Sequence, residues 1–215
     1  MRETTQRRAE TRQRILTAAG SLFRRHGIDG VGVDAVMREA GLTHGGFYLH
    51  FASKEALAAE AVRSLLETAA ARWDGLSRLP DGDAALRRIV RSYLDPAKVS
   101  SNSGCPLPMI GPDVARRPAS RGAIGGALRG MLDALTRCMP QGSADRRRQR
   151  AVAALATMVG AVVLSRLADD PGLADEFLAA ASADVVGSQP RADRPETGGE
   201  AEFNHAGTAP RTAPA

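Results

Sequence analysis

Cysteine and aromatic residues are scarce in this sequence. Cys105 and Cys138 are the only cysteines, and they lack the spacing of metal ligands, so neither a disulfide framework nor a metal site is expected. Aromatic residues make up 4% of the chain, whereas alanine and leucine are abundant, and this composition favours helix over sheet. We therefore expect an all-α protein.

The sequence also lacks a recognisable targeting, membrane or catalytic segment. Its amino terminus is polar and charged as far as Arg14, unlike a secretory signal peptide. The longest apolar run, residues 151–164, is shorter than the ~20 residues that a membrane span requires. Neither a nucleophile elbow nor a phosphate-binding loop is present. We expect a cytoplasmic protein with no membrane association, no cofactor and no enzymatic activity.

The net charge of +5 is concentrated near the amino terminus. Residues 1–54 contain nine Lys and Arg against five Asp and Glu, residues 55–188 seventeen against fifteen, and residues 189–215 three against four. A basic amino-terminal part suits a phosphate backbone, although a solvated arginine-rich surface would give the same bias. Residues 1–10 are accordingly either a basic arm near DNA or a frayed terminus without contacts.

Apolar residues at helical spacing predict about nine helices. Residues 151–164 are apolar on almost every side, so the helix that contains them must be covered all round. Glycine and proline mark most of the breaks between helices. The expected helices span residues 11–26, 33–40, 44–50, 54–76, 84–94, a short segment from 105 or 106, 120–138, 144–167 and 173–186.

Residues 33–54 are predicted to form two short helices joined by a tight turn. Gly41 ends the first apolar pattern, and Thr43 is in position to cap a second helix. Within that helix Phe47 would face inward and Tyr48 outward. A helix, a glycine turn and a second helix with an exposed polar face are typical of a helix-turn-helix, whose second helix enters the DNA major groove.

The same region resembles the DNA-binding domain of TetR/AcrR-type transcriptional repressors. The resemblance covers residues 11–62 and rests on the segments AAGSLFRRHGIDG, VDAVMREAGL and GGFYLHFASKEAL. It implies a DNA-binding domain of residues 1–52 and a ligand-binding and dimerisation domain of residues 53–188. Residues 189–215 are expected to be a disordered tail because they are rich in Pro, Gly and charge. Gly32 departs from the Ser or Thr usual in the family and is a weaker helix cap.

Four residues at the start of the second helix are expected to reach base edges: Thr43, His44, Gly45 and Gly46. Two glycines in succession cost a helix about 1 kcal/mol each relative to alanine. They could let the backbone approach the groove closely, or they could form a weak segment that becomes ordered on binding. The resemblance therefore does not predict the preferred DNA sequence.

Tyr48, His50 and Lys54 match family positions that contact phosphate. Lys54 is the strongest candidate, because a flexible cation beside a helix amino terminus offers a phosphate both its charge and backbone N–H groups. For His50 the alternative is a packed histidine that makes a hydrogen bond in the core.

Cys105 is predicted to begin a helix, where the helix dipole would lower its pKa and suit it to sensing oxidants or electrophiles. Some relatives use a cysteine at this place in that way. The alternative is a small buried apolar residue, which is also the expectation for Cys138. Other candidates for a ligand pocket, each of which could equally be an ordinary core residue, are Trp73, Tyr93, Met109, Met131 and Phe177.

The last two expected helices are predicted to form a homodimer interface. Left uncovered, their apolar surface would exceed what soluble monomers usually expose, and a four-helix bundle with a second copy would bury it. Gly160 would allow two helices to approach closely. The expected interface residues are Val152, Leu155, Val159, Val163, Phe177 and Ala181.

Together these patterns predict a homodimeric repressor that binds a double-stranded DNA operator and is released by a small apolar or electrophilic inducer. The alternative is a helical ligand-binding or redox-sensing protein that does not act through DNA. An enzyme is the weakest hypothesis, because no catalytic residues can be named.

Overall fold

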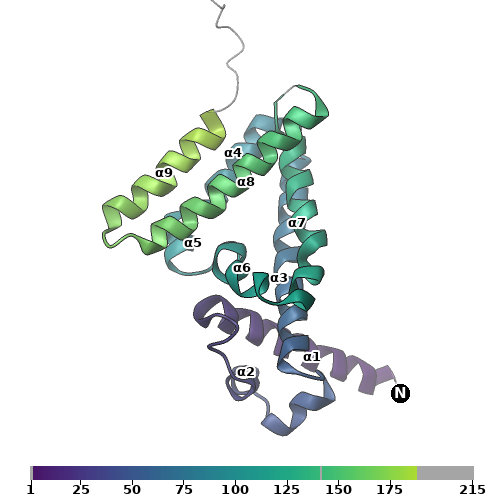
Figure 1. Ribbon diagram of the computed structural model, residues 1–215. Coiled ribbons are helices and arrows are strands. Elements are labelled where there is room, and N and C mark those ends of the chain that lie inside the picture. Colours follow the sequence, from purple (N-terminus) through teal and green to yellow (C-terminus); the bar gives the residue numbers. More distant parts are fainter. Residues whose placement is uncertain (1, 141, 188–215) are drawn as a thin grey trace, which may run out of the picture.

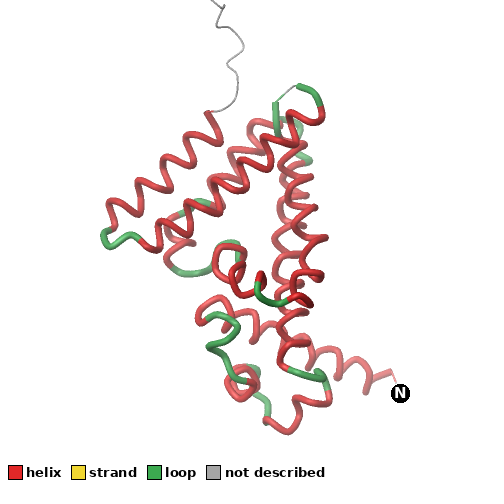
Figure 2. The backbone as a smooth tube through the Cα atoms, viewed as in Figure 1, coloured by secondary structure: helices red, strands yellow, loops and turns green. Residues whose placement is uncertain are grey.

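The computed structural model describes residues 2–140 and 142–187, and these ranges contain helices and loops but no strand (Figures 1 and 2). The expected all-α fold is confirmed. The tail predicted for residues 189–215 lies outside the described residues. The helices are α1 (Arg2–His26), α2 (Val33–Glu39), the 3-10 helix η1 (His44–Leu49), α3 (Lys54–Ser77), α4 (Gly82–Tyr93), α5 (Pro96–Ser100), α6 (Leu107–Ala115), α7 (Pro118–Cys138), α8 (Ala144–Leu167) and α9 (Pro171–Gly187).

Several helices begin at a residue whose side chain caps the first turn. Ser53 Oγ accepts a hydrogen bond from the Ala56 N–H of α3 at 3.1 Å. Asp81 caps α4 and Ser143 caps α8 in the same way. Each cap satisfies a backbone donor that has no partner within its helix, which contributes about 1 kcal/mol.

α1 begins at Arg2, so the prediction of a frayed segment over residues 1–10 is wrong. Gln6 donates to Glu10 one turn later at 3.1 Å, and Arg8 donates to the Leu49 carbonyl at 2.7 Å. The first contact supports the helix locally, while the second ties it to the last residue of η1. Most of these residues are also good helix formers.

Two further differences lie between α4 and α7. The short helix α5 was not expected, and it begins at Pro96 after a capping Asp95. α6 begins at Leu107 instead of residue 105 or 106, with Pro106 as its N-cap. Proline suits the start of a helix because its missing N–H would have no partner there.

Two apolar cores lie along α3, which extends between the two ends of the molecule (Figure 1). Leu57 and Leu66 belong to the first core, with α1, α2 and η1, whereas Trp73 belongs to the second, with α4, α7, α8 and α9. Ile110 of α6 also enters the first core. The division at residues 52 and 53 stays a prediction, and α3 is shared by both parts.

Within the described ranges, α8 is the one helix that is long and apolar enough, by length and composition, to cross a membrane. The helix has 24 residues and is therefore longer than the apolar run 151–164, which was compared with a membrane span in the sequence analysis. In the structure it packs along α9 and α7 (Figure 1), and Leu155 and Met158 are buried in the second core. Core packing therefore accounts for much of its apolar character.

Candidate nucleic-acid interface

The turn after α2 depends on glycine at position 41. Gly41 has φ +67°, a conformation that side chains other than glycine rarely adopt. Its N–H donates to the Arg38 carbonyl at 3.0 Å, and the Leu42 N–H donates to the Met37 carbonyl at 2.8 Å, which together form a Schellman motif. Arg14 of α1 donates to the Ala40 carbonyl at 2.6 Å. The angle between α2 and η1 is therefore fixed from both the turn and α1.

The second helix of the motif is a six-residue 3-10 helix, η1, instead of the α-helix expected over residues 44–50. Thr43 occupies the N-cap position, but its side chain makes no capping hydrogen bond, so the predicted cap is wrong in that respect. Gly45 and Gly46 lower the helix propensity of so short a segment, which explains the tighter and shorter form.

Phe47 and Tyr48 divide the inner and outer faces of η1 as the sequence predicts. Phe47 is fully buried and stacks on Phe51 with ring centroids 5.9 Å apart, whereas Tyr48 is 66% exposed. The Tyr48 ring stands edge-on to Phe47 at 5.2 Å. One aromatic side chain thus anchors the helix to the first core, and the next projects into solvent.

Thr43, His44 and Gly45 are exposed at the start of η1, and Gly46 is half-buried. His44 Nδ1 contacts the Asp34 carboxylate of α2, which orients its ring. A Cβ at Gly45 would meet no atom within 4 Å, and a Cβ at Gly46 would meet only Met37 Cε, at 3.7 Å. Packing within the chain therefore does not require glycine at either position.

Gly45→Ala is therefore expected to stabilise the folded protein. Alanine fits the open space, restricts the unfolded chain and favours helix, so the free energy of unfolding should rise by up to about 1 kcal/mol. Urea denaturation of the variant and wild type measures the change. Gly41→Ala is the matched control, and it should destabilise the protein because of its positive φ. A loss of stability in Gly45→Ala would contradict this account of η1.

Lys54 and His50 lie at the junction of η1 and α3. Lys54 is the first residue of α3, and its Nζ lies 3.4 Å from the Asp29 carbonyl. His50 Nδ1 is buried and has no hydrogen-bond partner in the described part of the chain. The core hydrogen bond that the sequence analysis considered for His50 is therefore not formed by this atom. Burial lowers the pKa of His50, and Arg8 and Arg12 lower it further. At neutral pH the His50 ring is therefore mostly uncharged in the protein without DNA.

Arg12 is a residue of this region that the sequence analysis missed. Its guanidinium pairs with Glu60 of α3 and lies over the Phe51 ring, 4.5 Å from the centroid. It therefore joins α1 to α3 beside His50. Arg8 and Arg12 are separated by one helical turn, and this spacing could have indicated a shared basic face.

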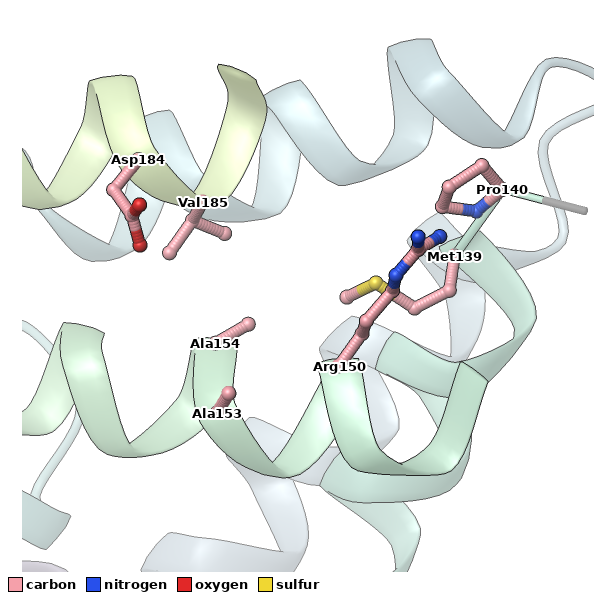
Figure 3. Close-up of a pocket in the computed structure, with 7 residues that line it drawn as sticks. All are labelled: Met139, Pro140, Arg150, Ala153, Ala154, Asp184 and Val185. Carbon is pink, nitrogen blue, oxygen red and sulfur yellow. The ribbon is translucent and has the colours of Figure 1, made fainter. Parts of the chain in front are cut away.

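The predicted ligand-pocket residues do not all lie together. Trp73, Tyr93 and Cys105 line one cavity of about 140 Å³, whereas Met109, Met131 and Phe177 are not among its lining residues. Met131 is fully buried in the second core. A second cavity of about 110 Å³ lies between α8 and α9, where Figure 3 shows Ala154 and Val185 facing each other, and no predicted pocket residue lines it.

Burial raises the pKa of the Cys105 thiol, so the prediction of a lowered value is wrong. The Leu107 N–H, the Tyr93 hydroxyl and the Arg24 guanidinium act in the opposite direction but do not overcome the loss of hydration. Burial likewise raises the pKa of Cys138. The helix-start argument for a reactive sensor therefore does not hold for Cys105, because its thiol is largely removed from water.

These features define a helix-turn-helix DNA-binding domain: a glycine turn after α2, a short second helix with an exposed outer face, and a basic residue at the start of the next helix. Residues 15–61 match the family model described as bacterial regulatory proteins, tetR family. Over these residues the chain thus matches the TetR family, which agrees with the resemblance that its sequence motifs indicate.

Comparison with individual proteins agrees with this assignment. The HTH-type transcriptional regulator LmrA of Bacillus subtilis is 41% identical over 59 residues, which are 27% of this chain and 31% of that protein's length. The chain thus spans about a third of the curated relative it matches.

Two solved structures extend the likeness of fold beyond that domain. A TetR-family regulator from Agrobacterium tumefaciens has a TM-score of 0.70 at 18% identity, covering 85% of this chain and 98% of its own. FadR from Bacillus subtilis, in complex with stearoyl-CoA, has a TM-score of 0.60 at 16% identity, covering 81% and 97%. The fold of the chain, including α4 to α9, is that of TetR-family regulators.

Proposed function

We propose that the chain is a homodimeric transcriptional repressor that binds operator DNA and is released by a small molecule. The observation that carries this proposal is the helix-turn-helix, with its exposed η1 face at the end of the molecule away from α8 and α9 (Figure 1). The cytoplasm, where the genome lies, is its proposed location. The competing function, a helical ligand-binding or redox-sensing protein independent of DNA, is less well supported, because the raised pKa of Cys105 removes its main argument.

In the proposed complex, two groups of residues have different tasks. Thr43, His44 and the backbone at Gly45 and Gly46 contact base edges and select the sequence. Tyr48, His50 and Lys54 contact the phosphate backbone and set the register. The exposure of Thr43 and Tyr48 and the position of Lys54 at the start of α3 support this division.

The proposed dimer uses an exposed apolar stripe on α8. Val152 and Val163 are exposed, and the stripe continues to Leu167, which is 75% exposed. Leu155 and Ala181 are buried within the single chain, so their side chains are not available to a second copy, and their predicted interface role is wrong. Val159 and Phe177 are half-buried and remain in the proposal. A Cβ at Gly160 would meet open space, which is compatible with close approach of a partner helix.

The proposed release mechanism runs through α6, which contacts the DNA-binding domain at its carboxyl end. Asp113 accepts a hydrogen bond from the Ile28 N–H at 2.8 Å. Arg117, just after α6, pairs with Asp29 and donates to Glu55 of α3 at 3.2 Å. The other end of α6 begins beside the 140 Å³ cavity, where Cys105 and Pro106 lie. A ligand that shifts α6 would therefore move contacts to both α3 and the segment before α2.

Lys54→Ala is expected to weaken binding to all DNA sequences alike. Loss of one phosphate contact should reduce the slope of log affinity against log salt by about 0.9. Titration of the protein's upstream DNA by fluorescence anisotropy at several salt concentrations measures this slope. Arg63→Ala is the matched control, because Arg63 lies on the same helix farther from η1 and pairs with Glu67. An unchanged slope for Lys54→Ala would contradict the placement of α3 on the DNA backbone.

A further inference from the structure

The cavity beside α6 has an unusual charge distribution. Three cationic side chains line it, Arg24 of α1, Arg72 of α3 and Lys98 of α5, and no carboxylate is among its lining residues. Lys98 Nζ donates to Ser92 Oγ at 2.9 Å. It also lies 3.6 Å from Oδ2 of Asp95, a residue that does not line the cavity. One carboxylate therefore lies near three cations.

Arg24 has a buried guanidinium nitrogen without a partner in the described structure. Its Nη1 donates to the carbonyls of Ser103 and Gly104, both at 3.3 Å, while its Nε is buried without a hydrogen-bond partner in the described structure. Burial lowers the pKa of Arg24, and the nearby Arg72 lowers it further. Buried polar groups normally find partners, and a cation held beside another cation is stabilised by an anion between them.

Aromatic and apolar side chains also line the cavity. The rings of Trp73 and Tyr93 meet edge-on with centroids 5.6 Å apart, and Leu65 and Pro106 also line the space. The Tyr93 hydroxyl is buried against the Cys105 thiol, and burial raises the pKa of Tyr93. A cavity lined by both cations and aromatic rings suits a ligand with an anionic group and a small apolar body.

We propose that this cavity is the inducer site and that its ligand is a small organic carboxylate, whose anionic group binds between Arg24, Arg72 and Lys98. This proposal rests on the proposed function and specifies its ligand class. The cavity volume of about 140 Å³ limits the apolar body to roughly the size of benzene, which fills a cavity of about 150 Å³ in another protein. A neutral or cationic molecule of the same shape binds more weakly, because it brings no negative charge to the three cations.

The position of Arg24 connects this site to DNA binding. Arg24 lies in the last turn of α1, which packs in the first core, whereas Arg72 and Lys98 lie beside the second core. An anion that binds all three draws the end of α1 toward α3 and α5. Because Arg24 also bonds to the loop before α6, the same ligand changes the position of α6.

The test uses benzoate and hexanoate as probes, with benzamide and hexanamide as neutral analogues. Isothermal titration of the full chain should show at least one carboxylate binding at least tenfold more tightly than its amide. Arg72→Gln should reduce that affinity at least tenfold. Arg63→Gln is the matched control, because Arg63 is also an exposed arginine of α3 but does not line the cavity, and it should leave the affinity unchanged. The bound carboxylate should also weaken binding to the upstream DNA at least fivefold.

Three results would overturn the proposal: no binding of either carboxylate up to about 10 mM, equal affinity for acid and amide, or an affinity that Arg72→Gln leaves unchanged. Binding without weaker DNA affinity would overturn the inducer role. DNA binding without ligand is measured on the same samples. If the protein does not bind DNA, the proposed repressor function fails. If it binds DNA but shows no selectivity for carboxylates, only the proposed ligand site fails. Arg24→Gln is the second variant if Arg72→Gln does not fold.

Discussion

Val152→Glu combined with Val163→Glu is expected to convert the proposed dimer into monomers. Both residues are exposed on α8, at 48% and 36%, so the substitutions add charge without disturbing the core of the chain. In the proposed interface four carboxylates would be buried without partners, at a cost of several kcal/mol each. Sedimentation velocity should show a single monomeric species.

The same double variant should lose operator affinity by about 100-fold or more, although η1 and α3 are untouched. In a dimer, binding of one recognition helix raises the effective concentration of the second at its half-site, and a monomer lacks this gain. Leu79→Glu is the matched control, because Leu79 is an exposed apolar residue outside α8 and α9. A double variant that stays dimeric would place the interface elsewhere, and a monomer with wild-type operator affinity would contradict the dimeric mode of binding.

Phe47→Ala is expected to unfold much of the DNA-binding domain. The Phe47 side chain is fully buried between Tyr48 and Phe51, and its removal leaves a cavity in the first core. Such changes cost about 3–5 kcal/mol, a large part of the total stability of a typical domain. Urea denaturation monitored by circular dichroism should show the loss, and DNA binding should disappear with it.

Tyr48→Ala is the matched comparison, since the neighbouring ring is exposed. It should leave the free energy of unfolding within about 0.5 kcal/mol of wild type and yet weaken DNA binding. Equal destabilisation by the two substitutions would contradict the assignment of inner and outer faces to η1. Unchanged DNA binding in Tyr48→Ala would remove that residue from the phosphate contacts.

Features that depend on local spacing could be predicted from the sequence. The bounds of α8 agree with those expected, because Ser143 caps its start and the apolar pattern ends near Leu167. Gly41 is predictable as the turn residue because the apolar pattern that begins at Val33 ends there. Phe47 and Tyr48 are predictable on different faces because neighbouring residues of a helix point in different directions.

Features that depend on distant contacts could not be predicted in this way. The start of α1 is tied by Arg8 to Leu49, 41 residues away. The pKa of Cys105 depends on burial that the sequence around it does not reveal. The cationic side of the cavity brings together α1, α3 and α5, and no local pattern links Arg24 with Arg72 and Lys98.

Selective binding to DNA is the central claim, and one titration tests it directly. Fluorescence anisotropy would compare a duplex from the upstream region of the gene with a duplex of the same composition in shuffled order, at about 50 and 200 mM salt. We predict saturable binding to the upstream duplex, about 10³-fold tighter than to the shuffled one, and weaker at the higher salt concentration. Equal affinity for the two duplexes, or no binding at about 50 mM salt, would contradict the claim.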